Sequence, residues 1–319
     1  MKQTVPLVVL AGPTASGKTR LGIDLAKRFD GEVISADSMQ IYRGMAVGTA
    51  QPTQEEMQGV PHHLIGFLQP GQEFSVAQYV ELAREKIAEI SARGRLPLVV
   101  GGTGLYISSL VDHVQFAPTG SSAAIREKYQ RMAQQQGNQA VLDCLSRVDP
   151  EAAKKLHSNN LGRVIRALEL YELTGKTMAE HLEQSRREPS PYRLCYLGLD
   201  YRDRQNLYNR INLRADLMLE QGLLEEAREL FSGSFSATAA QAIGYKELLP
   251  WYRGEDTLEH CMELVKQQSR RYAKRQLTWF RRDSRVQWLF PDQEESYAAL
   301  LEKACRCVEN SPAMCYTNL

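Results

Sequence analysis

The residues best suited to chemistry lie near the start of the chain, as the run Gly12, Pro13, Thr14, Ala15, Ser16, Gly17, Lys18 and Thr19. This run fits the phosphate-loop pattern G-x-x-x-x-G-K-[ST], with an apolar strand predicted over 5–11 before it and a helix after it. Glycines let backbone N–H groups point inward, and the helix N-terminus adds positive potential. Lys18 supplies a mobile charge, and the Thr19 hydroxyl can hold Mg²⁺. The pattern predicts a site for a pyrophosphate-like group and leaves ATP, GTP and other diphosphates open.

An acidic residue, Asp37, ends the second predicted strand, over 31–37. In many P-loop hydrolases an acid follows the third strand instead, but here the strand over 95–102 runs into glycines and Thr103. The carboxyl ends of parallel strands border the ligand crevice, so we expect Asp37 to face whatever the P-loop holds. A transferase therefore fits better than a motor or switch ATPase. The alternative is that Asp37 only caps the segment after it.

The elements that must position these residues alternate between strands and helices, which predicts an α/β fold with a P-loop NTPase-like parallel sheet. A capping box of Ser75 and Gln78 predicts a helix that ends at Gly94. Residues 121–184 show helical periodicity and little that resembles a strand, and a strand follows at 192–200. We therefore expect an all-helical domain inserted into the core, and a C-terminal helical region. The predicted parts are 1–112, 113–191 and 192–319, with long helices over 203–232 and 257–283 and a frayed tail after Asn310.

Composition is that of a globular protein: of 319 residues, 43% are hydrophobic and 24% charged, which excludes disordered, collagen-like and disulfide-stapled chains. The apolar run near the start is far shorter than the roughly 20 residues that cross a bilayer. The six cysteines form no CxxC pair, so reduced thiols in the cytosol are expected. We expect a cytoplasmic monomer with no membrane partner.

Positive charge is concentrated in residues 266–285, where eight lysines and arginines face one aspartate, a local charge of +7. The rest of the chain carries 31 basic and 37 acidic side chains, a charge of −6. Such a segment, interleaved with Trp279 and Phe280, predicts a polyanionic partner. The alternative is a solvated helix face.

Several blocks of the chain resemble those of the tRNA dimethylallyltransferase family. In order they are GPTASGKT (12–19), ISADSMQIYRGMAVGTAQP (34–52), PHHLIGF (61–67), LVVGGTGLY (98–106), VDPEAAKKLH (148–157), RVIRALELYELTGK (163–176), QAIGYKE (241–247) and AKRQLTWFRR (273–282). The resemblance spans nearly the whole chain, and the absence of a zinc-finger extension points to the bacterial form.

The resemblance implies transfer of a dimethylallyl group from its diphosphate to the exocyclic amine of the adenosine 3′ of the anticodon, in tRNAs that read codons starting with U. It implies that residues 12–19 hold the diphosphate with Mg²⁺ on Thr19, and that Asp37, Thr19 and Arg214 are catalytic. It further implies contacts to the tRNA anticodon stem-loop from Asp37, Ser38, Met39, Gln40, Thr103, Arg126, Gly162, Arg163, Arg166, Gly244, Tyr245, Lys246, Lys274, Arg275, Gln276, Trp279 and Arg281.

Three other functions remain open from the residues alone. A small-molecule kinase would also place an acid at the end of the second strand, but it leaves the basic segment unexplained. A prenyltransferase acting on free adenine nucleotides needs the same core and neither the inserted helices nor the basic segment. A non-enzymatic RNA-binding module leaves the complete P-loop unused.

Overall fold

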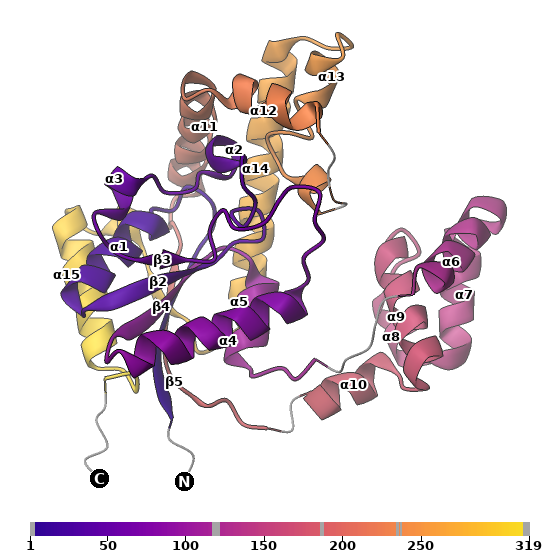
Figure 1. Cartoon of the computed structure of the whole chain (residues 1–319), viewed down its shortest axis with the longest axis horizontal. Helices are drawn as coiled ribbons and strands as arrows, with labels where there is room; N and C mark the ends of the chain where they lie inside the picture. Colours follow the sequence, from indigo (N-terminus) through magenta and orange to yellow (C-terminus); the bar gives the residue numbers. More distant parts are fainter. Residues whose placement is uncertain (1–3, 117–121, 186–187, 234–235, 237, 315–319) are drawn as a thin grey trace. The chain divides into compact units, whose positions relative to one another are not determined.

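The structure, a computed structural model, describes residues 4–116, 122–185, 188–233, 236 and 238–314. It divides into two compact units. Unit 1 combines Met1–Val111 with Pro191–Leu319, and unit 2 is Asp112–Ser190 (Figure 1). The chain therefore leaves unit 1 after its first half, folds unit 2, and returns to complete unit 1.

Unit 1 is built on one sheet of six parallel strands in the order β3-β2-β4-β1-β5-β6. The strands are β1 (Val5–Ala11), β2 (Gly31–Ala36), β3 (His62–His63), β4 (Leu96–Gly101), β5 (Tyr192–Leu199) and β6 (Gln287–Leu289). In the centre, Val8 pairs with Leu98 on one side and with Cys195 on the other. This parallel sheet confirms the predicted fold class. The first strand after the inserted unit, β5, pairs directly with β1. The sequence did not predict the short outer strands β3 and β6.

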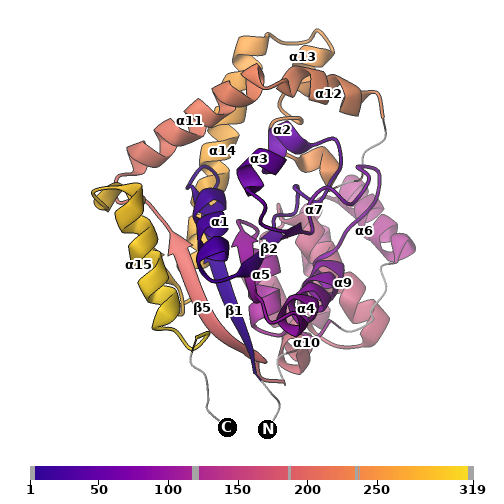
Figure 2. The same cartoon turned by 60° about the vertical axis from the view of Figure 1, so that its left-hand side comes forward.

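Helices cover both faces of the sheet, because alternate residues of each strand point to opposite sides. Val8 and Leu10 of β1 belong to one buried cluster with residues of α1 and α15, whereas Leu7 and Val9 belong to another with residues of α4 and α5. Figure 2 shows β1 and β5 side by side, with α15 beside β5. The helices of unit 1 are α1 (Lys18–Arg28), α2 (Ala46–Thr49), α3 (Gln54–Met57), α4 (Val76–Ala92), α5 (Gly104–Val111), α11 (Arg204–Glu220), α12 (Leu223–Phe231), α13 (Leu249–Tyr252), α14 (Leu258–Phe280) and α15 (Tyr297–Glu309).

Two predictions about the second half of the chain are wrong. Residues 203–232 form two helices, because Gly222 takes the left-handed φ of 97° that ends α11 and starts α12 in a new direction. Residues 311–314, predicted to fray, are packed instead, as Ser311 and Ala313 are buried and Ala313 joins the cluster beneath α1 and α15. The rest of the predicted frayed tail, residues 315–319, lies outside the described residues.

Unit 2 contains only helices within residues 122–185: α6 (Ala123–Gln136), α7 (Asn138–Val148), α8 (Pro150–Lys155), α9 (Leu161–Thr174) and α10 (Met178–Ser185). It has its own buried cluster, which includes Val141, Leu145, Val164 and Leu168. α9 ends at Gly175, whose φ of 69° suits the left-handed position after a helix.

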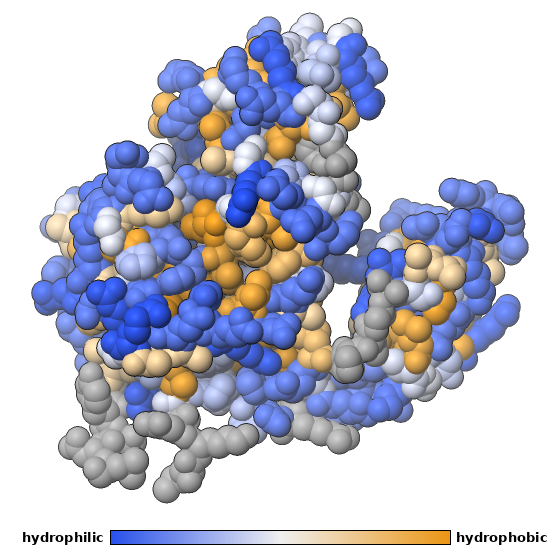
Figure 3. All heavy atoms as spheres, in the orientation of Figure 1, coloured by the Kyte–Doolittle hydropathy of each residue, from blue (hydrophilic) through white to orange (hydrophobic). Residues whose placement is uncertain are grey.

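Most of the surface seen in Figure 3 is hydrophilic, and apolar side chains gather in the middle of unit 1 above α4. None of the helices in the described parts of the chain has the length and apolar character needed to span a membrane.

A buried carboxylate, Glu32, ties together the strand that leads to Asp37 and its neighbours. His63 of β3 contacts it at 2.7 Å, Arg93 donates two hydrogen bonds of 2.7 and 3.2 Å, and Arg95 lies 3.3 Å away. Burial alone raises the pKa of Glu32, but the hydrogen bonds from Arg93, His63 and Arg95 outweigh it, so the pKa is lowered overall. The charged carboxylate therefore stabilises this edge of the sheet.

We expect Glu32→Gln to lower the free energy of unfolding at pH 7 by about 1–2 kcal/mol, less than for a fully buried pair because both arginines reach solvent. A lowered folded pKa gives stability that is present above the ordinary glutamate pKa of 4.5 and lost below it. Urea unfolding from pH 7 to pH 3 should therefore show the two proteins converging below about pH 4.5. Glu89→Gln, which breaks an exposed pair with Lys86, is the control and should change little. A difference that stays constant with pH would contradict this role.

Candidate active site

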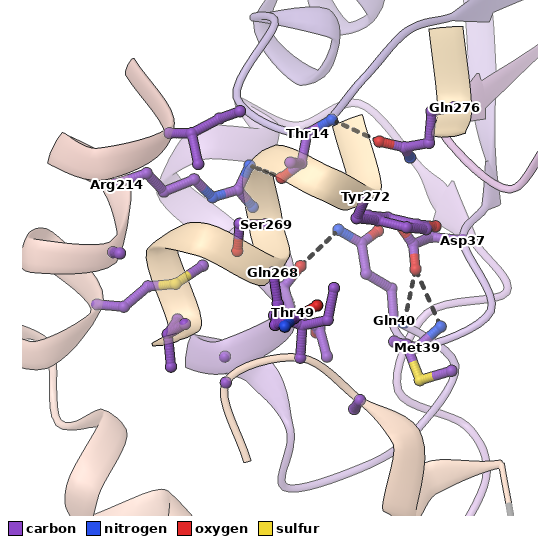
Figure 4. A pocket seen from close by; sticks show the side chains of 18 of the residues that line it. Thr14, Asp37, Met39, Gln40, Thr49, Arg214, Gln268, Ser269, Tyr272 and Gln276 are labelled. Atoms are coloured by element: carbon purple, nitrogen blue, oxygen red, sulfur yellow. Dashed lines mark hydrogen bonds between the residues drawn. The ribbon is translucent and has the colours of Figure 1, made fainter. Parts of the chain in front are cut away.

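A cavity of about 340 Å³ lies in unit 1, where the P-loop, the end of β2 and the facing sides of α11 and α14 meet (Figure 4). Most of the residues that line it are polar or small, and a few are larger apolar side chains such as Ile211 and Met218. The lining consists of Thr14, Lys18, Thr19, Asp37, Ser38, Met39, Gln40, Gly48, Thr49, Ile211, Arg214, Ala215, Met218, Gln241, Ala242, Ile243, Gly244, Lys246, Val265, Gln268, Ser269, Tyr272, Arg275 and Gln276. The predicted diphosphate loop, the predicted base and Arg214 therefore share one cavity.

The P-loop has the conformation that an anion site requires. Ala15 and Gly17 take positive φ angles of 61° and 92°, which turn the backbone sharply before α1. Gly17 is the N-cap of α1 and provides no side chain to cap it, so amides of the first turn face the loop. The Ser16 hydroxyl is buried and has no hydrogen-bond partner among the residues described. These free donors suit the oxygens of a diphosphate.

Two cations meet at the loop. Lys18 donates to the Pro13 carbonyl at 3.3 Å, and Arg214 of α11 donates to the Thr14 hydroxyl at 3.3 Å. The pKa of Lys18 is lowered to about 8, mainly by burial and then by the nearby charge of Arg214, while the charge of Asp37 acts in the opposite direction. Adding a diphosphate would relieve the repulsion between the two cations. The positive charge of the loop is therefore suited to a polyanion.

Asp37 follows β2 and presents its carboxylate at the cavity wall. Its Oδ1 accepts hydrogen bonds from the backbone amides of Met39 at 2.9 Å and Gln40 at 3.4 Å, as Figure 4 shows. No described residue hydrogen-bonds to Oδ2. Asp37 therefore caps the following turn with Oδ1 and leaves Oδ2 for a ligand. Its role as a cap is compatible with a role at the ligand.

Gln40 and Thr103 hold the wall around Asp37. The Gln40 side chain accepts from Ser35 at 3.0 Å and donates to the carbonyls of Thr49 and Ala50 at 3.2 and 2.9 Å, so protein groups use both ends of its amide. Thr103 Oγ1 accepts from the Ser38 amide at 2.9 Å. Both residues therefore support the part of the cavity wall that carries Asp37.

Gln276, a predicted tRNA contact, holds the P-loop through its side-chain amide. Its side-chain oxygen accepts from the Thr14 amide at 3.0 Å, and its nitrogen donates to the Gly102 carbonyl at 2.9 Å. Gln276 is buried, and its amide joins the P-loop to the end of β4. The amide therefore holds the P-loop, and a contact from Gln276 to tRNA stays a prediction.

Sequence reasoning missed a row of residues on α14 that face the cavity, namely Val265, Gln268, Ser269 and Tyr272. Their spacing of three, four and seven residues marks one side of a helix, but nothing local shows that a ligand lies there. Tyr272 lies beside Asp37 in Figure 4, and its hydroxyl is within hydrogen-bonding reach of Thr103 and Gln276. Burial and the charge of Asp37 raise the pKa of Tyr272, so its hydroxyl remains a donor.

The other predicted tRNA contacts in unit 1 differ in how exposed they are. The Tyr245 side chain is buried and its hydroxyl donates to Glu226, so only its backbone is left for RNA and the contact stays a prediction. The Trp279 indole donates to the Ser108 hydroxyl at 2.8 Å and remains partly exposed. Arg281 pairs with the buried Asp200. Lys274 is exposed, and Gly244 and Lys246 line the cavity.

The predicted contacts in unit 2 lie on α6 and α9. Arg126 and Arg166 both pair with Glu169, which is completely buried, at 2.9 and 2.6 Å. Their guanidinium groups remain partly exposed. Gly162 and Arg163 lie in the exposed first turn of α9. This part of the site stays a prediction.

Comparison with known proteins identifies the family. The profile described as IPP transferase matches residues 40–283, and a second, described as isopentenyl transferase, matches residues 5–66. The chain belongs to the IPP transferase family. Among curated relatives of this family, the tRNA dimethylallyltransferase of Thermoanaerobacter sp. (strain X514) is 48% identical over 299 residues, which is 93% of this chain and 95% of the relative.

Solved structures of the IPP transferase family have the same fold. The full-length tRNA isopentenylpyrophosphate transferase from Bacillus halodurans is 44% identical, with a TM-score of 0.70 over 95% of this chain and 97% of that one. A eukaryotic dimethylallyltransferase, seen in crystallographic snapshots acting on tRNA, is 32% identical with a TM-score of 0.75, over 87% and 70% of the two chains.

We expect Gln276→Met to raise the KM for the allylic diphosphate donor by roughly 5- to 30-fold, because two buried backbone groups would lose their partner and the loop its anchor. The affinity for tRNA should remain unchanged. Gln267→Met, on the same helix and outside the cavity lining, is the control. Weaker tRNA binding with an unchanged KM for the donor would show that Gln276 contacts tRNA and does not support the P-loop.

Proposed function

We propose that this protein transfers a dimethylallyl group from dimethylallyl diphosphate to the exocyclic amine of the adenosine 3′ of the anticodon, in tRNAs reading codons that start with U. The observation that carries this proposal is the single cavity that joins the P-loop, the cations Lys18 and Arg214, and the free oxygen of Asp37. Relatives named tRNA dimethylallyltransferase cover nearly the whole chain and support it.

The reaction breaks the bond between the allylic carbon and the diphosphate oxygen, and the electron pair leaves with pyrophosphate. Amides of the P-loop, Lys18 and Arg214 would neutralise this leaving group. The adenine amine attacks the allylic carbon and becomes acidic as it does so, and Oδ2 of Asp37 accepts the released proton. Thr103 and Tyr272 would keep the base in line with Asp37.

Magnesium would be held at Thr19, the last residue of the P-loop. Its hydroxyl lines the cavity and is a hard oxygen ligand, and Mg²⁺ typically takes one or two protein oxygens together with those of a phosphate. The residues present therefore fit the ion, which would neutralise charge on the diphosphate. We propose Mg²⁺ as cofactor on this basis.

The acceptor would be an unmodified tRNA, gripped through its anticodon stem-loop. An adenosine stacked in that loop must be extruded to enter a cavity of this size. The exposed Arg271, Lys274 and Arg282 have no ion-pair partner among the described residues, so they suit backbone phosphates. We also propose that the protein acts as a cytoplasmic monomer.

We expect Asp37→Asn to lower the single-turnover rate by roughly 10²- to 10⁴-fold, since the amide keeps the cap but cannot accept the proton. Donor affinity should hold or rise slightly, because an anion near the diphosphate is removed. Rapid-quench transfer with both substrates saturating is the measurement. Asp30→Asn, next to the other end of the same strand, is the control. A variant that reaches the wild-type rate would show that Asp37 only positions the base.

Lys274→Ala should reduce the slope of log affinity for tRNA against log salt by roughly 0.7–0.9, the contribution of one phosphate contact. Its stability should not change, because the side chain is exposed. Filter binding between 50 and 300 mM salt measures the slope. Arg281→Ala is the informative comparison, as it leaves Asp200 without its closest cation and should lower stability. An unchanged slope for Lys274→Ala would mean that this face of α14 does not meet RNA.

A further inference from the structure

Glu226, a carboxylate of α12 outside the cavity lining, joins two segments that do line the cavity. Its Oε2 accepts a hydrogen bond from the Val47 amide and its Oε1 one from the Gly48 amide, each at 2.9 Å. Oε1 also accepts from the Tyr245 hydroxyl at 2.5 Å. One carboxylate therefore uses both of its oxygens to hold the start of α2 and the segment 241–247 together.

The start of α2 depends on this partner from outside. Its N-cap residue is Met45, whose side chain makes no capping hydrogen bond. The first amides of a helix have no acceptor within the helix itself. Glu226 supplies the acceptor from 178 and 179 positions further along the chain, and Figures 1 and 2 both show α2 beside α12. The position of α2, which has only four residues, is therefore set by α12.

A close packing contact accompanies these hydrogen bonds. Tyr245 is buried, and a Cβ atom at Gly48 would lie 2.5 Å from the Cζ atom and the hydroxyl of its ring. That distance is too short for any side chain, so only glycine lets α2 approach the ring this closely. Gly48 and Thr49 of α2 line the cavity, as do Gly244 and Lys246 on either side of Tyr245 in the sequence. The contact therefore fixes two parts of the cavity wall against each other.

Further hydrogen bonds connect α2 to the turn that begins at Asp37. The Gln40 side chain donates to the carbonyls of Thr49 and Ala50 at the end of α2, at 3.2 and 2.9 Å. Gln51, which follows α2, donates from its side chain to the Gln40 carbonyl at 3.0 Å. The Gln40 amide in turn donates to Oδ1 of Asp37, and Figure 4 shows Asp37, Gln40 and Thr49 around the cavity. A shift of α2 would therefore displace this turn and the carboxylate of Asp37.

We propose that Glu226 is a positioning residue: it holds α2 in the place that keeps the turn after β2, and with it Asp37, correctly oriented for transfer. The inference rests on the proposed function, because it takes Asp37 as the base. The P-loop is held separately, by contacts of Gln276 and Arg214 with Thr14. Glu226 should therefore influence the chemical step and leave binding of the donor unchanged.

The test begins with Glu226→Gln in the full chain. The side-chain amide has one oxygen in place of two, so its NH₂ group would face one of the three donors. We expect the single-turnover rate, with dimethylallyl diphosphate and an unmodified tRNA transcript both saturating, to fall roughly 10- to 100-fold. The dissociation constant of dimethylallyl diphosphate should remain unchanged. Glu229→Gln removes the same charge from an exposed position of α12 and should keep the wild-type rate.

A double-mutant cycle with Asp37→Asn separates positioning of the base from a general structural role. If Glu226 acts through Asp37, Glu226→Gln should lower the rate far less in the Asp37→Asn protein than in the wild type. Rates are expressed per folded molecule, so that a loss of stability does not count as a loss of rate. Equal fold-losses in the two backgrounds would overturn the inference. Weaker donor binding at an unchanged rate would overturn it as well.

Gly48→Ala tests the same contact with Glu226 intact, and it decides the question if Glu226→Gln does not fold. The added methyl group would meet the buried Tyr245 ring, so α2 must move away from Glu226. The rate should again fall at unchanged donor affinity, and a wild-type rate would overturn the inference. Wild-type protein that transfers no dimethylallyl group would instead contradict the proposed function.

Discussion

Placing a lysine and an arginine together out of water is unfavourable, and the site depends on that unfavourable arrangement. Burial and the neighbouring Arg214 lower the pKa of Lys18 to about 8, and the charge of Asp37 opposes them only in part. A bound diphosphate supplies the missing negative charge, so binding and electrostatic relief are the same event. The fold must hold the two cations together against their mutual repulsion. Contacts from distant parts of the chain do this: Arg214 reaches Thr14, and Gln276 joins the loop to β4.

The two substrates of the proposed reaction need different amounts of protein surface. The donor needs only the P-loop and the cations beside it, which unit 1 provides. A tRNA acceptor needs a wide polar surface and space for one extruded base. In the proposed function, exposed cations on α14 offer part of such a surface. The inserted unit interrupts unit 1 between α5 and β5 without breaking the sheet.

Local patterns in the sequence were enough to predict the parallel sheet and to select Asp37, because both depend on residues close together in the chain. The P-loop carries its own glycines, and Asp37 directly follows a strand. The role of Gln276 could not be predicted locally, since its partner Thr14 is 262 positions away. The burial of the Tyr245 ring could not be predicted for a related reason: its motif is close to the cavity, yet the ring packs against Gly48, nearly 200 positions away. The residues of α14 from Val265 to Tyr272 that line the cavity lie on one side of the helix. Only the packing of α14 against α11 shows that this side faces the cavity.

The central claim is that donor and acceptor meet directly in one cavity. The most direct measurement mixes the protein with dimethylallyl diphosphate labelled at its reactive carbon and an unmodified tRNA transcript, then quantifies the label and the pyrophosphate released. The account predicts label on the exocyclic amine of one adenosine, one pyrophosphate per label, and no label on the protein. Label trapped on the protein, or transfer to free adenine nucleotides in preference to tRNA, would contradict it.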